Sequence, residues 1–578
     1  MKTHLLFFLF ALFFSFELSA QFGPENGVKA SEPKFVLIQH ATIMVKPGQT
    51  LTDADLLLQN GKIIQVGKNL KQDGAVALDY TGKVLVPSFI DMYSSVGIDP
   101  VTFKNNGWRP QLASNKEGAY YWNEAVHPEL NASAAYKVIE NNSDQLQQSG
   151  FGFALTHHMD GVVRGSAAFV ALGQKEVDKQ LLAPKAAQVF SFSKGGSNQT
   201  YPSSQMGAIA LLRQALYDLD YYSKNKALLP YSVSLSEWES QRNLPTIFKT
   251  EDKWEILRAQ KIANEFKTNF LYIGSGNEYA IANELKSKGI KLVLPLVFPE
   301  AYEVNDPYLA REIPLSDLKH WETAPSNAKL LKKEGLDIAF TSFGLKNADQ
   351  FWTALRKVIS RGLSPTDAMA ALTTVPANWL GLSTQVGTLE TGKWASFSVF
   401  SADPFAFEAQ LLETWSLGEA RFWKPATSVQ LLGTYSLRIA EDNYELLVTG
   451  TSEKPQGKIS FKTASDTLST KATIQLKQQD VSIQFLSLST SNSQLIQLHA
   501  KVLKNGLVLE GDGTDAKGAW FHWSAIQQQT TPSIAPIAIK PDTTVYGKVW
   551  FPNMAFGTIE KAAEQTYIFK NATVWTNE

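Results

Sequence analysis

The stretch that decides the fold is Val84-Leu85-Val86-Pro87-Ser88-Phe89-Ile90-Asp91-Met92-Tyr93-Ser94-Ser95. Four of the six residues from Val84 to Phe89 are apolar, and polar side chains follow them. A short apolar run of this kind is typical of a strand that is covered on both faces. The pattern therefore predicts a buried strand whose polar end, from Asp91 to Ser95, opens into a cavity.

The length and composition exclude several classes of protein. A chain of 578 residues is long enough for several domains, because single cores stop growing near about 250–300 residues. Its 54 basic and 55 acidic residues create no strong field, so nucleic acid and anionic lipid are not expected partners. The absence of cysteine excludes disulfides, thiolate metal sites and a cysteine nucleophile.

The first 20 residues have the pattern of a secretory signal peptide. Lys2 precedes an apolar run from Leu5 to Phe16, and Ser19-Ala20 follows as a site for cleavage. The apolar run is shorter than the ~20 residues of a spanning helix, although an uncleaved anchor is the alternative. We expect residues 1–20 to be removed, leaving a secreted or periplasmic protein without membrane contact.

Strands precede the first helix. The segment 35–45 is rich in β-branched and apolar residues, and Asn60-Gly61 is a turn that favours positive φ between two strand patterns. Several short strands at close spacing predict a small β-domain over residues 31–88.

Helix and strand patterns alternate farther along the chain. Expected helices at 278–288 and 327–334 end at Gly289 and Gly335, and expected strands follow at 291–297 and 336–341. Another helix is expected at 348–360. Such alternation predicts parallel strands joined by crossover helices. Over residues 89–383, a (β/α)8 TIM-like barrel is the natural closure, which makes the fold class α/β.

The pattern of polar and apolar residues changes after residue 432. Segments such as Thr434–Ile439 and Thr473–Leu476 alternate between polar and apolar residues, and this alternation predicts an additional antiparallel β-domain at 433–526. Four prolines in residues 527–566 indicate a linker.

Two segments carry a resemblance to a known family. Residues 87–95 resemble the first barrel strand of the amidohydrolase superfamily, P-G-F-I-D-x-H-x-H. Residues 371–382 and 387–395 are similar to its A-L-T-x-x-P-A-x-x-L-G-L and G-x-L-E-x-G-K-x-A signatures. The resemblance implies a metal-dependent hydrolase of the imidazolonepropionase or dihydroorotase type, with a composite β-sandwich formed by residues 31–88 and 384–432.

The resemblance also implies where metal ligands belong, and other residues stand there. The family places a His-x-His pair on strand 1, histidines on strands 5 and 6, and an aspartate on strand 8. Here those positions fall on Tyr93 and Ser95, Phe248, Ile273 and Phe343. None of these is a good ligand for a divalent metal. We therefore expect no catalytic, cofactor-binding or metal site here; an active protein would need zinc or another divalent metal.

The only histidine cluster is a weak alternative metal site. It consists of His157-His158-Met159-Asp160. Adjacent residues of a strand point to opposite faces, so only one of the two histidines could join Asp160 there. Because a closed zinc site has about four ligands, a structural role for the cluster is favoured.

Residues 567–575 echo residues 36–44. Both segments contain Ala-Thr within an apolar strand pattern. Our hypothesis is that 567–578 is the first strand of a truncated second amidohydrolase-like module, supplied in cis or in trans. The alternative is a terminal edge strand that resembles the first strand by accident.

These observations predict an exported, catalytically silent first module of a tandem amidohydrolase, which is to say a pseudoenzyme. The first alternative is a metal-dependent hydrolase acting on C–N bonds in non-peptide or small-peptide amides. A further alternative is a protein that binds a small amide, peptide or glycan at the barrel mouth or on the 433–526 sheet.

Overall fold

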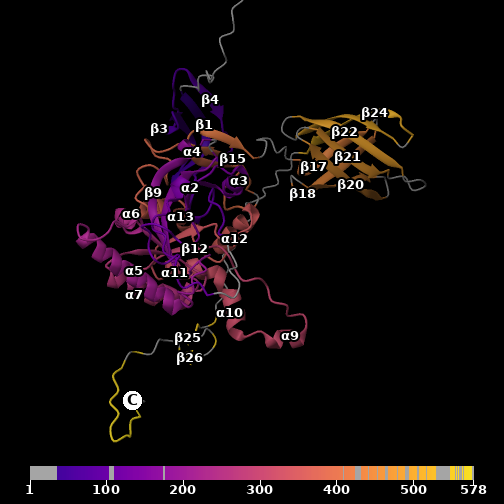
Figure 1. Ribbon diagram of the computed structural model, residues 1–578. Coiled ribbons are helices and arrows are strands. Elements are labelled where there is room, and N and C mark those ends of the chain that lie inside the picture. The colour runs from indigo at the N-terminus through magenta and orange to yellow at the C-terminus, as the bar shows by residue number, and fades with distance from the viewer. Residues whose placement is uncertain are drawn as a thin grey trace, which may run out of the picture.

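The computed structural model describes most of the chain (Figure 1). The described residues are 35–102, 110–173, 176–407, 409–423, 431–439, 442–451, 454–462, 466–477, 480–487, 494–503, 507–515 and 517–528, with parts of 547–575. The predicted signal peptide and much of the predicted linker lie outside them. In the described part, no helix is long and apolar enough to cross a membrane.

One mixed sheet joins segments from two distant parts of the chain. Its strands are β1 (Phe35–Lys46), β2 (Gln49–Gln59), β3 (Lys62–Gly67), β4 (Ala75–Asp79), β5 (Val84–Pro87), β14 (Phe397–Phe400), β15 (Leu411–Ser416) and β16 (Glu419–Phe422). The order is β16-β15-β14-β5-β1-β2-β3, with β4 also paired to β1. The β2–β3 hairpin turns at Asn60 and Gly61, both at positive φ, as predicted.

A second eight-stranded sheet follows the predicted buried strand. Its strands are β6 (Phe89–Ser94), β7 (Phe151–Thr156), β8 (Val163–Ala171), β9 (Leu181–Ser191), β10 (Thr246–Lys249), β11 (Phe270–Ile273), β12 (Lys291–Pro295) and β13 (Ile338–Thr341). They lie in chain order from β6 to β13. Side-chain hydrogen bonds from Thr341 to Asp91 and to the Tyr93 carbonyl join the two ends of the sheet.

The regular (β/α)8 TIM barrel is not confirmed. Strands β6 and β7 are parallel, as are β9 to β13, but β8 is antiparallel to both β7 and β9. Only residues 157–162 connect β7 to β8. A parallel return needs a dozen or more residues, so this connection forces β8 to run backwards.

Helices cover the outer face of the second sheet (Figure 1). The helices of this part of the chain are α2 (Ala132–Ala135), α3 (Glu140–Gln148), α4 (Val177–Gln180), α5 (Gln205–Asn225), α6 (Val233–Gln241), α7 (Lys253–Glu265), η2 (Glu278–Ile281), α8 (Ala282–Ser287), α9 (Pro307–Glu312), α10 (Leu315–Thr323), η3 (Ala324–Ser326), α11 (Asn327–Lys333), α12 (Ala348–Ser360), α13 (Pro365–Leu372) and α14 (Thr374–Trp379). Two of them do not cover the outer face, since α9 buries none of its residues and α14 packs against side chains enclosed by the sheet. The predicted helix 348–360 is confirmed as α12, and the Ser364 side chain caps α13 by accepting from the Asp367 amide.

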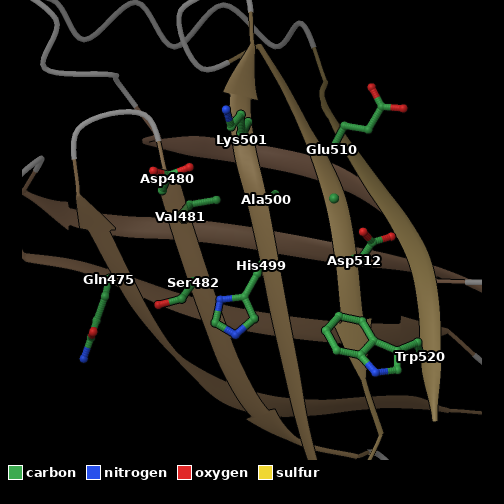
Figure 2. A pocket seen from close by; sticks show the side chains of 11 residues that line it. Gln475, Asp480, Val481, Ser482, His499, Ala500, Lys501, Glu510, Asp512 and Trp520 are labelled. Atoms are coloured by element: carbon green, nitrogen blue, oxygen red, sulfur yellow. The ribbon is translucent and has the colours of Figure 1, made fainter.

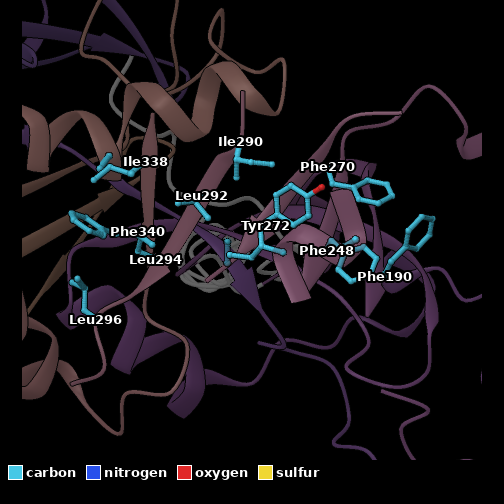
Figure 3. Close-up of a cluster of buried hydrophobic side chains, with 14 of the residues drawn as sticks. Phe190, Phe248, Phe270, Tyr272, Ile290, Leu292, Leu294, Leu296, Ile338 and Phe340 are labelled. Atoms are coloured by element: carbon cyan, nitrogen blue, oxygen red, sulfur yellow. The ribbon is translucent and has the colours of Figure 1, made fainter. Parts of the chain in front are cut away.

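Alternation along the strands divides their side chains between two cores. In β11, Tyr272 belongs to the outer core beneath the helices, whereas Leu271 and Ile273 belong to an inner core enclosed by the sheet. Figure 3 shows part of the outer core, in which Phe190, Phe248, Phe270 and Tyr272 form successive aromatic contacts.

The predicted antiparallel β-domain is confirmed, and it closes into a barrel. Its strands are β17 (Gly433–Ile439), β18 (Asp442–Thr451), β19 (Lys454–Lys462), β20 (Thr467–Lys477), β21 (Asp480–Leu486), β22 (Leu495–Leu503), β23 (Val508–Thr514) and β24 (Trp520–Gln527). Pairing of β17 with β24 closes it. A core of its own includes Tyr435, Ile483 and Trp523. Two further short strands, β25 (Phe551–Pro552) and β26 (Gly557–Thr558), pair with each other.

Candidate functional site

The candidate site lies at one edge of the second sheet, where the parallel strands end. Tyr93 lies near the end of β6, and Lys249 ends β10. His157 follows β7, and Phe343 follows β13. Because β8 runs backwards, its second residue, Arg164, reaches the same edge. We call these five residues the mouth.

Arg164 is buried at the mouth, with 5% of its surface exposed. Its Nε donates to the Gly161 carbonyl at 3.0 Å, Nη1 to the Tyr93 hydroxyl at 2.7 Å, and Nη2 to Ser191 Oγ at 3.0 Å. No ion pair joins it to a carboxylate within the described residues. A buried positive charge is thus held by neutral oxygen atoms, which makes its hydrogen bonds indispensable.

Aromatic rings and a second cation fill the rest of the mouth. The Tyr93 ring lies 4.6 Å from His157 and 4.8 Å from Phe343, centroid to centroid. Lys249 Nζ lies 5.8 Å from the Phe343 ring centroid and 3.3 Å from Glu251 Oε2. The mouth therefore combines rings in tilted and edge-to-face contact with two cationic side chains.

His157 is fully buried and electrically neutral at ordinary pH. Its Nδ1 lies 2.7 Å from the His158 carbonyl oxygen, so this nitrogen carries the proton. Its Nε2 is buried and has no hydrogen-bond partner. Burial lowers the pKa of His157 to about 3. The unprotonated Nε2 is consistent with a ring packed against Tyr93.

Asp91 connects the two ends of the sheet. Its carboxylate is completely buried and accepts from Thr341 Oγ1 and Ser342 Oγ, both at 2.5 Å, and from the Tyr93 amide at 3.2 Å. Burial raises the pKa of Asp91 above its ordinary value. This residue of the quoted segment therefore ties β6 to the chain after β13.

The structure brings some predicted positions together and separates another. Tyr93 contacts Phe343, and Ser95 lies beside them in the lining of a cavity of about 240 Å³. Ile273 faces the inner core. The prediction for Phe248 was wrong, because this residue packs in the outer core (Figure 3). The next residue along β10, Lys249, lies beside Phe343 instead. The strand-5 position at the mouth is thus a lysine.

The histidine cluster lies in the loop between β7 and β8. Asp160 Oδ1 accepts from the Gly196 amide at 2.6 Å. His158 and His127 are partly buried beside Asp160, and burial lowers the pKa of His127 to about 4. Within the described residues, no group of three or more histidines and carboxylates is arranged to hold a metal ion.

Comparisons with known proteins identify the scaffold. The sequence profile of the "Amidohydrolase family" matches residues 306–422, which include both signatures noted above. Over these residues the chain is similar to the amidohydrolase family. Amidohydrolase tasK from Hapsidospora irregularis is 31% identical over 102 residues, which are 18% of this chain and 10% of that protein. This chain thus spans about a tenth of tasK.

Two longer matches agree with this assignment. Dihydroorotase from Ligilactobacillus salivarius (strain UCC118) is 22% identical over 385 residues, or 60% of this chain and 85% of that protein. The crystal structure of an amidohydrolase from Thermotoga maritima MSB8 superimposes with a TM-score of 0.56 at 22% identity. That match covers 67% of this chain and the whole of the other, and it supports the fold.

The mouth does not fit the divalent metal that the similarity to amidohydrolases implies. Phe343 and Ile273 carry no donor atoms, and the Tyr93 hydroxyl already accepts from Arg164. The buried guanidinium adds positive charge where a metal cation would bind. Both the donor set and the charge are therefore unsuitable.

Sequence reasoning missed Arg164 and Lys249. One signal for Arg164 was present, since it is the only charged residue between Gly161 and Gly173. A charge in such an apolar strand indicates a specific buried partner. That partner, Tyr93, lies 71 residues away in sequence and is identified only by the fold.

A second hollow, of about 600 Å³, lies on the outside of the β17–β24 barrel (Figure 2). Strand pairing places Asp480, Lys501 and Glu510 in one row across it and Ser482, His499 and Asp512 in the next. Trp520 is 76% exposed at one end of the hollow. We call these seven residues the outer hollow. Beside them, His522 pairs with Asp512 at 3.2 Å.

Proposed function

We propose that this protein is an exported, catalytically silent amidohydrolase-like module that acts together with a second module. The observation that carries the proposal is the mouth, where a buried guanidinium and packed rings occupy the place of metal donors. Similarity to a family of hydrolases does not by itself confer activity, because function depends on the residues of the site.

Electrostatics supports this proposal. A divalent cation at the mouth would face repulsion from the cationic side chains of Arg164, which is buried, and Lys249. Replacing ligands by apolar rings also removes the repulsion among carboxylates and histidines that an empty metal site would retain. The arrangement therefore favours a stable mouth without metal.

Two finer features belong to the same proposal. We regard the β6–β13 sheet as a modified (β/α)8 barrel in which the reversed β8 replaces one crossover. The pattern of residues 1–20 supports secretion or a periplasmic location. A purely structural or positioning role then requires a partner module.

Metal analysis tests the proposal directly. We expect protein purified without chelators to contain far less than one metal ion per chain and to release no product from a panel of amides and cyclic amides. Near-stoichiometric zinc, manganese or iron with hydrolysis would contradict it. The variant Tyr93→His with Ser95→His is the matched control, and it should also remain metal-free because Phe343 and Ile273 still lack donor atoms.

The second candidate is a metal-dependent hydrolase acting on C–N bonds. The similarity to amidohydrolases and the cavity of about 240 Å³ beside Tyr93 and Ser95 favour it. The same metal and amide assays distinguish the two candidates, since only the hydrolase requires a bound cation for turnover.

A further inference from the structure

The segment 567–575 is extended and exposed although it is rich in large apolar side chains. The exposed fractions are 72% for Tyr567, 78% for Ile568, 84% for Phe569, 70% for Val574 and 92% for Trp575. No backbone ladder pairs it with a strand in the described part of the chain. Contiguous exposed apolar surface of this kind marks an interaction site.

The segment matches strand β1 position by position. Aligning Ala572-Thr573 with Ala41-Thr42 places apolar residues at every buried position of the matched part of β1. The buried residues of that part are Leu37, Ile38, Ala41 and Ile43, and the matching residues are Ile568, Phe569, Ala572 and Val574. Because a shift by one residue would reverse every side chain, this agreement specifies one register.

The backbone conformations of the two segments also agree at the one matched position that has a positive φ. His40 has a φ of 60°, at the irregularity where the β1–β2 pairing shifts between Ile38 and Ala41. Asn571, its match, has a φ of 57°. Few residues other than glycine adopt this left-handed conformation, although asparagine does so more readily than most. The exposed segment thus has the same positive φ as β1 at this position, although no strand equivalent to β2 pairs with it in the described part of the chain.

We infer that residues 567–575 form a β1-type strand that completes the β-sandwich of a second amidohydrolase-like module. In this chain β1 pairs with β2, β4 and β5. The partner module must therefore have strands equivalent to β2, β4 and β5, with the place of β1 between them unoccupied. Strand addition of this kind obtains affinity from main-chain hydrogen bonds and specificity from alternate side chains. The inference deepens the proposed function, on which it rests for the partner's identity.

A chimera of the full chain tests the equivalence. In it, the sequence of residues 567–575 replaces residues 36–44 in register. A control chimera carries residues 566–574 instead, which places Asn571 at the fully buried position of Ala41. We expect a small shift of the thermal transition for the first chimera and loss of the cooperative transition of the β1-containing sheet for the second. Equal loss in both would overturn the inference.

A fusion tests docking. Residues 45–423 of this chain, which lack most of β1, are appended after Trp575, so that the segment can complete the added sandwich. We expect a second cooperative transition and protection of 567–575 from protease. The matched variant Ala572→Asp should abolish both effects in the fusion but leave the unfused chain unchanged, because Ala572 is exposed there.

If Ala572→Asp has no effect on the fusion, or the segment stays protease-sensitive, the inference fails. Metal content and amide hydrolysis are independent of this outcome. A metal-containing protein whose segment docks would overturn catalytic silence alone, whereas a metal-free protein whose segment does not dock would overturn the strand assignment alone.

Discussion

The mouth and the outer hollow differ in the burial of their charged residues. At the mouth, Arg164 is buried and bonded to neutral oxygens, and His157 is kept neutral. In the outer hollow, Lys501 stands between Asp480 and Glu510 on neighbouring strands, with all three side chains exposed. The comparison teaches that burial, rather than residue type, decides whether a charge is essential to the fold.

The difference has a topological origin. In the β17–β24 barrel, every strand pairs antiparallel and outward side chains reach water. In the β6–β13 sheet, the reversal of β8 directs Arg164 toward the enclosed edge. Changes at the mouth should therefore affect stability, whereas changes in the outer hollow should leave it nearly constant.

Arg164→Met should have the largest effect. It removes the buried guanidinium that donates to the Gly161 carbonyl, the Tyr93 hydroxyl and Ser191 Oγ, and it should lower the free energy of unfolding by about 3 kcal/mol or more. Urea unfolding followed by hydrogen exchange would assign the loss to the β6–β13 sheet. Arg164→Lys is the control. It should retain only part of the stability that Arg164→Met loses, because an ammonium group cannot reproduce the directed N–H donors of a guanidinium. A loss below about 1 kcal/mol would remove the distinction between the two regions.

Lowering the pH should destabilise the mouth next most strongly. Because the folded pKa of His157 is about 3, against an ordinary value of 6.5, the unfolded chain takes up the proton first. This stability is complete above pH 6.5 and is lost as the pH falls toward 3, by at most about 1.4 kcal/mol per pH unit. Unfolding free energies between pH 7.5 and 5 would measure the slope.

His157→Asn provides the control for the pH experiment, because its amide can still donate to the His158 carbonyl but does not titrate. The raised pKa of Asp91 acts in the opposite direction and is present in both proteins, so their difference isolates the histidine. The same slope in both proteins would show that His157 is not buried neutral.

Tyr93→Phe should have a smaller effect. It removes the oxygen that accepts from Arg164 Nη1 and should cost about 1–2 kcal/mol. When Tyr93→Phe is added to Arg164→Met, the further loss of stability should be much smaller than the loss caused by Tyr93→Phe alone, because both changes remove the same contact. Strictly additive losses in urea unfolding would argue against a direct role for this hydrogen bond.

Trp520→Ala should have the smallest effect. Its side chain is 76% exposed, so the barrel's free energy of unfolding should change by no more than about 0.5 kcal/mol. Thermal unfolding would measure it, with Trp523→Ala as a contrast, since Trp523 is buried in the barrel core. A large loss at Trp520 would mean that the outer hollow is structural as well.

Local patterns predicted much of the scaffold. The β2–β3 hairpin, α12 and the antiparallel strands after residue 432 depend on turns, caps and alternation, which act over a few residues. Tyr93 and Phe343, which stand at two of the expected ligand positions, lie in contact at the mouth. The prediction was wrong by one residue at Phe248, because a shift of one position moves a strand side chain to the other face.

By itself, the sequence determined the resemblance to amidohydrolases and the identity of the residues at the expected ligand positions, since both are matters of which residues stand in a recognisable order. Only the tertiary structure decided what occupies the mouth. The Asp91–Thr341 hydrogen bond joins residues 250 apart, and Arg164 reaches Tyr93 because a short loop reverses β8. Such contacts depend on the pairing of whole strands, which no local pattern of residues specifies.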